Sequence, residues 1–247
     1  MSPRNAAIRG FVREITVPDA ARCDPSPRVP CHRQQCSARF LIAAALFLTQ
    51  CTRPASLTNP EAVLSATAPA SFRARFETSQ GPFTVEVTRA WAPIGADRFY
   101  NLVRARFFDR QKFFRVRARF IAQFGLHPDP NVIMAWKGRT MPDDSARTSN
   151  ARGTLAYAML TTPNTRSTQI YINLVDNSAQ LDQQRFAPFG RIVEGIDVID
   201  KLYAAYDERA GGGMRAGNQV PIEREGNAWF ERNFPKLDYI ITVRLVR

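Results

Sequence analysis

The side chains best suited to chemistry lie in residues 113–125. Arg115, Arg117 and Arg119 alternate there with apolar residues, and a second apolar run then leads to Gln123. A guanidinium stays charged at any working pH and carries several N–H groups in a fixed fork, so this stretch could supply a cationic hydrogen-bond donor. The simpler interpretation is two short strands joined by a bend, with one buried face and the arginines in water.

Other chemistries lack the residues that they need. The chain has two histidines, His32 and His127, and no Gly-x-Ser-x-Gly elbow, which argues against a serine-hydrolase triad. It also has no Gly-rich phosphate-binding loop. All four cysteines precede residue 71, and a four-ligand set at zinc spacing is missing. We therefore expect neither a metal nor a cofactor.

Further stretches of sequence favour a functional role for this arginine-containing segment over the simpler interpretation. They are residues 154–159 (TLAYAM), 163–172 (PNTRSTQIYI), 181–182 (LD) and 189–193 (FGRIV). Taken with Phe113-Phe114-Arg115, Phe120, Gln123 and Gly125, they resemble in order and spacing the signatures of the cyclophilin family of peptidyl-prolyl isomerases. The resemblance covers roughly residues 71–246 and leaves out the first seventy.

The resemblance implies catalysis of rotation about X–Pro peptide bonds during protein folding. This rotation meets a barrier of roughly 18–20 kcal/mol, because the C–N bond has partial double-bond character. A catalyst needs a pocket for the proline ring and a cationic donor that stabilises the twisted amide, but no nucleophile, metal or proton relay. The alternative on the same barrel is a non-catalytic module or chaperone that binds proline-containing segments without turnover.

The same resemblance assigns roles to individual residues. Arg115 would supply the cationic donor, and Gln123 would orient it. The implied substrate-binding residues are Phe120, Ile121, Met159, Gln169, Tyr171, Leu181 and Phe186. The implied partners are proline-containing unfolded or extended polypeptides, with weak cyclosporin binding.

This sequence departs from the family pattern at several points. Ala118-Arg119 replaces a frequent Pro-Gly pair, Gln180 replaces a frequent tryptophan, and Phe186 stands where the best-known members have a rim histidine. If glycine is needed at position 119 for an unusual backbone angle, the bend there is altered. The departures concern inhibitor affinity and substrate preference more than the reaction.

The elements that must position these residues follow from their hydrophobic period. Residues 71–88 predict a hairpin, and a helix with one apolar face begins near Pro93. Further strands are expected in 153–159, 169–174, 189–193 and the C-terminal run, a second amphipathic helix over 196–203, and a third short helix within 221–233. The expected fold is mainly β, a closed eight-stranded antiparallel β-barrel capped by two α-helices. The count of eight strands comes from the resemblance.

The first seventy residues are expected to lie outside this barrel. Residues 1–38 lack a period and would be disordered or untranslated, and residues 52–70, rich in Pro, Ala, Ser and Thr, would form a linker to a domain over 71–247. Residues 39–51 place nine apolar side chains behind a basic flank, as a secretory signal does, and end in a lipobox-like sequence at Cys51. We expect a protein of the bacterial cell envelope, either periplasmic or tethered to the membrane through lipidated Cys51.

The charge of the chain is strongly basic. Its 34 Lys and Arg against 22 Asp and Glu give a formal net charge of +12. The arginines are scattered, however, and no run of five like charges or nucleic-acid motif is present. We therefore expect no specific nucleic-acid binding.

Overall fold

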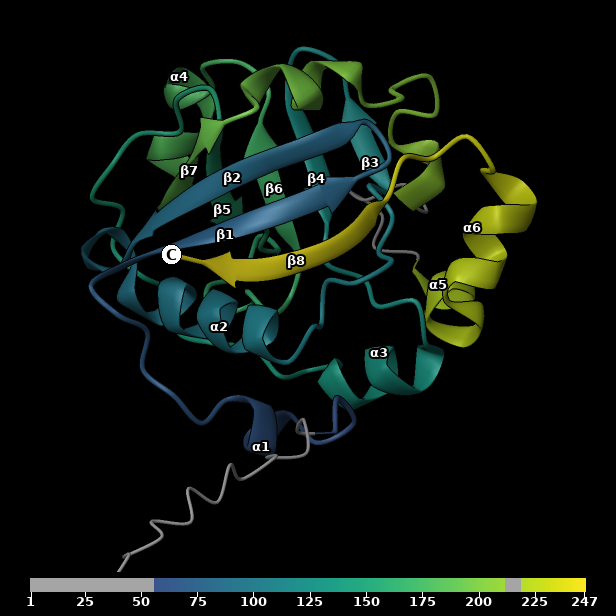
Figure 1. Ribbon diagram of the computed structural model, residues 1–247, viewed down its shortest axis with the longest axis horizontal. Coiled ribbons are helices and arrows are strands. Elements are labelled where there is room, and N and C mark those ends of the chain that lie inside the picture. Colours follow the sequence, from purple (N-terminus) through teal and green to yellow (C-terminus); the bar gives the residue numbers. More distant parts are fainter. Residues whose placement is uncertain (1–55, 212–218) are drawn as a thin grey trace, which may run out of the picture. The chain divides into compact units, whose positions relative to one another are not determined.

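The computed structural model describes residues 56–211 and 219–247, all of which belong to one compact unit. At its centre an antiparallel sheet curls around an apolar core (Figure 1). The strands lie in the order β3-β4-β6-β5-β7-β2-β1-β8. Their bounds are β1 Ser71–Thr78, β2 Gly81–Thr88, β3 Arg115–Arg117, β4 Ile121–Phe124, β5 Thr154–Tyr157, β6 Ile170–Asn173, β7 Pro188–Glu194 and β8 Ile240–Val246. The predicted eight-stranded antiparallel fold is confirmed.

The two ends of the curled sheet meet through a short contact. Just before β3 and β8, Lys112 and Tyr239 form an isolated antiparallel bridge. The Phe113 N–H donates to the Asp238 carbonyl at 2.9 Å, and the Ile240 N–H donates to the Gln111 carbonyl at 2.8 Å. The barrel is therefore joined here by a bridge, while its other neighbouring strands share ladders.

Helix α2, Pro93–Arg104, covers one side of the core. It begins with proline at its first turn, where a missing N–H costs nothing. Ala96, Phe99 and Leu102 recur at helical spacing and are fully buried. The remaining α-helices are α1 Pro60–Val63, α3 Pro130–Trp136, α4 Ser178–Leu181, α5 Val220–Glu225 and α6 Asn227–Asn233, and the 3₁₀ helices are η1 Arg89–Trp91, η2 Asp182–Gln184, η3 Ile196–Lys201 and η4 Arg209–Gly211.

The second predicted helix differs from the expectation of an α-helix. Residues 196–201 form the 3₁₀ helix η3. Only six residues separate Gly195, which is left-handed at φ +74°, from Leu202, which is extended. The Val198 N–H donates to the Gly195 carbonyl at 3.0 Å, three residues back along the chain, which is the 3₁₀ pattern. Of the apolar face that the pattern predicted, Ile199 and Leu202 are buried, whereas Ile196 is 37% exposed.

The third predicted helix is two short helices. Gly226 ends α5 with φ +57°, and α6 begins directly after it. A Cβ at this position would lie 2.0 Å from the Pro128 carbonyl oxygen, so only glycine lets the two chain segments approach this closely. The α5–α6 pair is thereby held beside the segment that leads into α3.

The expected linker packs on the domain over its described part. Val63 of α1 is 4% exposed and belongs to the main core. Trp136 of α3 donates its indole N–H to the Leu57 carbonyl at 2.8 Å. The Ala68 N–H donates to Asp97 of α2 at 2.8 Å. The hydrogen-bond partners of this segment thus lie in α2 and α3, and its Pro- and Ala-rich composition alone does not predict them.

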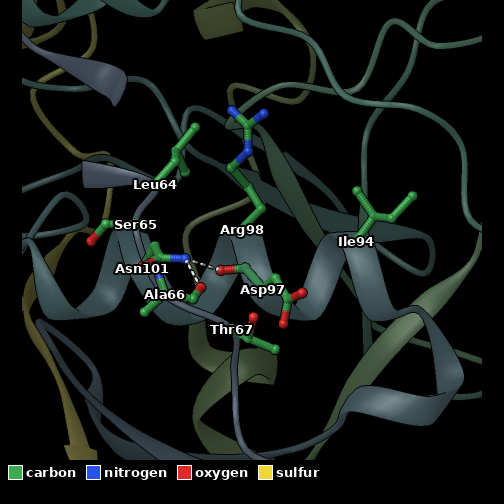
Figure 2. A pocket seen from close by; sticks show the side chains of 8 residues that line it. All are labelled: Leu64, Ser65, Ala66, Thr67, Ile94, Asp97, Arg98 and Asn101. Atoms are coloured by element: carbon green, nitrogen blue, oxygen red, sulfur yellow. Dashed lines mark hydrogen bonds between the residues drawn. The ribbon is translucent and has the colours of Figure 1, made fainter. Parts of the chain in front are cut away.

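A shallow hollow of about 320 Å³ lies along this seam between residues 64–67 and α2. Figure 2 shows the side chains that line it. Asn101 spans it and donates to the carbonyls of Ala66 at 2.6 Å and Asp97 at 2.8 Å (Figure 2). None of the predicted site residues lies there. The hollow is a packing seam between α2 and the segment before β1.

The proposed disordered stretch, the signal-like segment and Cys51 lie outside the described residues. Within the described ranges, no helix combines the length and apolar character that a membrane crossing requires.

Candidate active site

The site is built on the outer face of four neighbouring strands. In register across the sheet, Arg115 of β3 faces Gln123 of β4, Gln123 faces Tyr171 of β6, and Tyr171 faces Ala156 of β5. Because side chains alternate between the faces of a strand, these four residues point to the same side. Their sequence neighbours Val116, Ala122, Leu155 and Ile172 all belong to the main core on the opposite face.

The turn between β3 and β4 gives this face its shape. Arg119 has φ +58°, a left-handed conformation that a non-glycine residue adopts at a cost. The departure from glycine noted in the sequence therefore falls on a position where the backbone favours glycine. Arg117 lies with its guanidinium carbon 5.6 Å from the centre of the Phe120 ring. Both arginines stay at the rim of the site, while Arg115 lies deeper.

The side chain of Arg115 is 11% exposed, and its guanidinium is held from two sides. One terminal nitrogen, Nη1, donates to the Gln123 side-chain oxygen at 3.3 Å. The other, Nη2, donates to the Glu208 carboxylate at 2.5 Å. The remaining nitrogen, Nε, is buried and has no hydrogen-bond partner in the described residues. The side chain is thus oriented while part of its donor capacity stays unused.

A line of hydrogen-bonded side-chain amides extends from Arg115. Gln123 accepts from Arg115 with its oxygen and donates with its nitrogen to the Gln169 oxygen at 3.0 Å. Gln169 in turn donates to Gln219, the N-cap residue of α5, at 3.0 Å. Since each amide both accepts and donates, its orientation is fixed. The line connects the sheet face to the α5–α6 pair.

An apolar cluster separate from the main core lies next to Arg115. Ile121, Ala156, Tyr171 and Leu181 form its buried part, with Phe120, Ala158 and Phe186 packed at its edge. The rings of Tyr171 and Phe186 meet edge to face at 5.5 Å. The cluster offers an apolar surface of the kind that would accept a proline ring.

Buried hydrogen bonds hold this cluster in place. Burial raises the pKa of Tyr171 well above its usual value, so the neutral phenol donates to Asn150 at 2.8 Å. Burial also tends to raise the pKa of Asp182, but hydrogen bonds from Ser149 and Asn150 outweigh it and hold that pKa below its usual value. Asp182 directly follows Leu181, so its ionised carboxylate anchors the segment that carries Leu181.

A groove of about 1,610 Å³ opens over the cluster. Of the residues that the sequence singled out, it is lined by Arg115, Gln123, Phe120, Ile121, Met159, Tyr171, Leu181 and Phe186. Gln169 is not in the lining, and its amide is engaged behind Gln123 instead. Gln180, the site of the missing tryptophan, lies in the wall of the groove.

The close approach of β4 and β6 at the floor depends on Gly125. This residue has φ +116°, and a Cβ there would lie 2.3 Å from the Thr168 carbonyl oxygen. The Thr168 hydroxyl donates to the Gly125 carbonyl at 2.9 Å. Glycine is therefore the residue that lets the end of β4 meet the chain that enters β6.

Two polar residues of the site escaped prediction from sequence. Glu208 and Gln219 flank a Gly-rich segment with no hydrophobic period, and they lie far from Arg115 and Gln169 along the chain. No local pattern marks either of them.

His127, the one histidine among the described residues, has its pKa lowered by burial and accepts from the Asp129 N–H at 3.0 Å, away from the groove. Within the described ranges, no group of His, Cys, Asp or Glu could hold a metal.

Comparison with known proteins shows which family this chain resembles. Residues 73–225 match the sequence profile of the family described as cyclophilin type peptidyl-prolyl cis-trans isomerase/CLD. The chain is 31% identical over 143 residues to a peptidyl-prolyl cis-trans isomerase of Acinetobacter baylyi, covering 57% of this chain and 76% of that protein. It is 28% identical over 142 residues to peptidyl-prolyl cis-trans isomerase B of Escherichia coli, covering 55% of this chain and 87% of that protein.

Solved structures show the same fold. The crystal structure of a cyclophilin type peptidyl-prolyl cis-trans isomerase from Cryptosporidium parvum superposes with a TM-score of 0.52 at 17% identity, covering 72% of this chain and 98% of that one. A structure of that protein in the presence of the dipeptide Ala-Pro gives a TM-score of 0.51. The family profile matches more than half of the chain, including both motif-bearing strand pairs of the site. The chain therefore belongs to the family of cyclophilin-type peptidyl-prolyl cis-trans isomerases.

Proposed function

We propose that this protein catalyses cis–trans isomerisation of X–Pro bonds in unfolded or extended polypeptides. One observation carries the proposal: the guanidinium of Arg115, on a side chain that is 11% exposed, lies beside a separate apolar cluster at the floor of an open groove. A cationic donor and a ring-sized apolar surface are the two parts that this reaction needs. Membership of the family supports the same activity.

In the proposed mechanism, the proline ring occupies the apolar cluster and fixes one side of the amide bond. Rotation breaks the amide resonance and leaves a lone pair on the proline nitrogen. The N–H groups of Arg115 stabilise this twisted state more than the planar one, and Gln123 keeps them oriented. No bond is made or broken, so the rate enhancement rests on preorganised electrostatics.

The test is the rate of isomerisation of a proline-containing peptide in a protease-coupled assay. Arg115→Ala should lower kcat and kcat/KM together, by a factor of roughly a hundred to a thousand, because it removes an interaction made in the transition state. Arg115→Lys should restore little, since a point ammonium cannot replace the planar fork. Arg117→Ala is the matched control at the rim and should cost much less.

The same assay separates the two functions that the barrel could serve. A catalyst must turn over, whereas a binding module would bind the peptide with no rate enhancement. Equal activity of the wild type and Arg115→Ala would show that this residue is not the catalytic donor. Peptide binding without acceleration by the wild type would favour the chaperone alternative.

We also propose weak cyclosporin binding in the same groove. Gln180 lies in the wall where many relatives carry a tryptophan. The amide keeps a donor but loses the large aromatic contact area. Gln180→Trp should therefore tighten binding in a calorimetric titration, and an unchanged affinity would show that this position does not touch the ligand.

We propose export to the bacterial cell envelope on the pattern of residues 39–51. The processed protein would begin near Cys51 and fractionate with the envelope. A Cys51→Ser variant should lose any lipid attachment. Recovery of the unprocessed chain from the cytosol would contradict this localisation.

A further inference from the structure

The acidic partner of Arg115 has no role in the mechanism proposed above. Glu208 accepts from Nη2 of Arg115 at 2.5 Å, while Gln123 accepts from Nη1 at 3.3 Å. A hydrogen bond between two charged groups is shorter and stronger than one to a neutral amide. Of the two contacts that orient the guanidinium, the one to Glu208 is therefore the stronger.

The backbone around Glu208 is tied to the strand that carries Arg115. Asp207 forms an isolated bridge with Val116 of β3. Directly before it, the ring of Tyr206 packs on Phe234 at 5.1 Å, next to the end of α6. These contacts bring the carboxylate to Arg115 from a segment 93 residues away along the chain.

Glu208 is not part of the groove lining. Arg115, Arg117 and Gln123 all line the groove. A carboxylate inside the groove would compete with the peptide for the same donors. This one instead contacts Arg115 from outside the peptide-binding surface, and it also lies 3.7 Å from Arg117 at the rim.

Burial makes such a partner necessary. The Arg115 side chain is 11% exposed, and a guanidinium so far removed from water is costly without a counter-charge. A long arginine side chain also has many rotamers, so a donor that must be preorganised needs a fixed contact. Glu208 meets both needs with one carboxylate.

We propose that Glu208 is the positioning residue of Arg115, which holds the guanidinium in the orientation that stabilises the twisted amide. This inference rests on the proposed isomerase function. It predicts that Glu208 acts through Arg115 and contributes to kcat more than to KM, because Glu208 is not part of the groove lining.

The experiment measures kcat and KM for the Glu208 variants in the coupled assay. Glu208→Ala should lower kcat about tenfold with KM within about twofold of the wild type. Glu208→Asp should behave in the same way, because the shorter side chain keeps the charge but does not reach Nη2. Glu208→Gln should stay within about threefold of the wild type, since its amide oxygen can still accept the hydrogen bond.

The control is Glu86→Ala. Glu86 of β2 also lies between two arginines, Arg73 at 3.2 Å and Arg191 at 3.9 Å, with a side-chain exposure of 26% against 29% for Glu208. The substitution removes a carboxylate of similar exposure from a surface ion pair outside the groove, whose arginines are 46% and 58% exposed, and should leave kcat unchanged. Thermal melts of all variants check that they remain folded.

A double-mutant cycle decides whether Glu208 works through Arg115. In the Arg115→Ala background, Glu208→Ala should have no further effect on kcat. An additional tenfold loss in that background, or a Glu208→Ala enzyme as fast as the wild type while Arg115→Ala is impaired, would overturn the inference.

A second readout keeps this inference distinct from the proposed function. The Arg115 side-chain Nε–H signal in an NMR spectrum should be sharp in the wild type and broadened or shifted in Glu208→Ala and Glu208→Asp. If Arg115→Ala were fully active, the catalytic assignment would fail, while the NMR result would still test the positioning. An unchanged Nε–H signal in both variants would refute it.

Discussion

The two faces of strands β4, β5 and β6 are both buried, but by different means. On the inner face, Ala122, Phe124 and Leu155 pack only against apolar neighbours of the main core. On the outer face, Gln123 and Tyr171 are engaged in hydrogen bonds with side chains from distant segments. The comparison suggests that the inner face sets the stability of the barrel and the outer face sets its chemistry. Four substitutions or deletions test this division, in order of decreasing expected effect.

The largest effect is expected from Phe124→Ala on the inner face. The Phe124 ring meets three others edge to face, those of Phe76 at 5.8 Å, Phe108 at 5.6 Å and Phe113 at 5.7 Å. Its removal leaves a cavity and should lower the free energy of unfolding by about 3–5 kcal/mol. Urea denaturation measures this loss. A change below about 1 kcal/mol would mean that the core relaxes around the cavity.

Removing the segment before β1 tests how far the inner core extends. A chain that begins at residue 71 lacks Val63 and also lacks Ala66, the partner of Asn101 in that segment; the loss of one buried valine side chain from the core alone costs about 2 kcal/mol. We expect this chain to fold but to melt at a lower temperature than one that begins at residue 56. Equal melting temperatures would show that residues 56–70 add nothing to stability, as expected of a linker.

Phe120→Ala changes the outer face without touching the main core. Phe120 lies at the edge of the apolar cluster and lines the groove. We expect peptide binding to weaken by about 1.5 kcal/mol, or roughly tenfold, because part of the proline pocket is lost. The free energy of unfolding should change far less than in Phe124→Ala. A large loss of stability with unchanged KM would reverse the division between the faces.

The smallest effect is expected at the turn that joins β3 and β4. Arg119 is left-handed at φ +58°, which costs a non-glycine residue about 1 kcal/mol or more. Arg119→Gly should therefore raise the melting temperature slightly, although the greater freedom of glycine in the unfolded chain offsets part of the gain. The matched control is Arg117→Gly, at a position within β3, which should be destabilising. If both substitutions lower the melting temperature, relief of backbone strain at Arg119 is smaller than the entropy that glycine adds to the unfolded chain.

The sequence alone determined the inner face. Period-two alternation and turn residues predicted the hairpin of β1 and β2 and the strands of the site, and helical spacing predicted the apolar face of α2, because both patterns depend on local backbone geometry. These elements could be predicted because each follows from residues close together in the chain. The residues expected around Arg115 came instead from the resemblance to the cyclophilin family, which compares stretches far apart in the chain.

Only the tertiary structure decided the remainder. Residues 196–201 form the 3₁₀ helix η3 in place of the expected α-helix, and residues 56–70 pack because α2 and α3 supply partners that lie elsewhere in the sequence. Gln169 lies behind Gln123 rather than at the surface of the groove. Glu208 reaches Arg115 across 93 residues. A hydrogen bond between side chains so far apart leaves no periodic trace in the sequence, because it depends on where the folded chain brings them together.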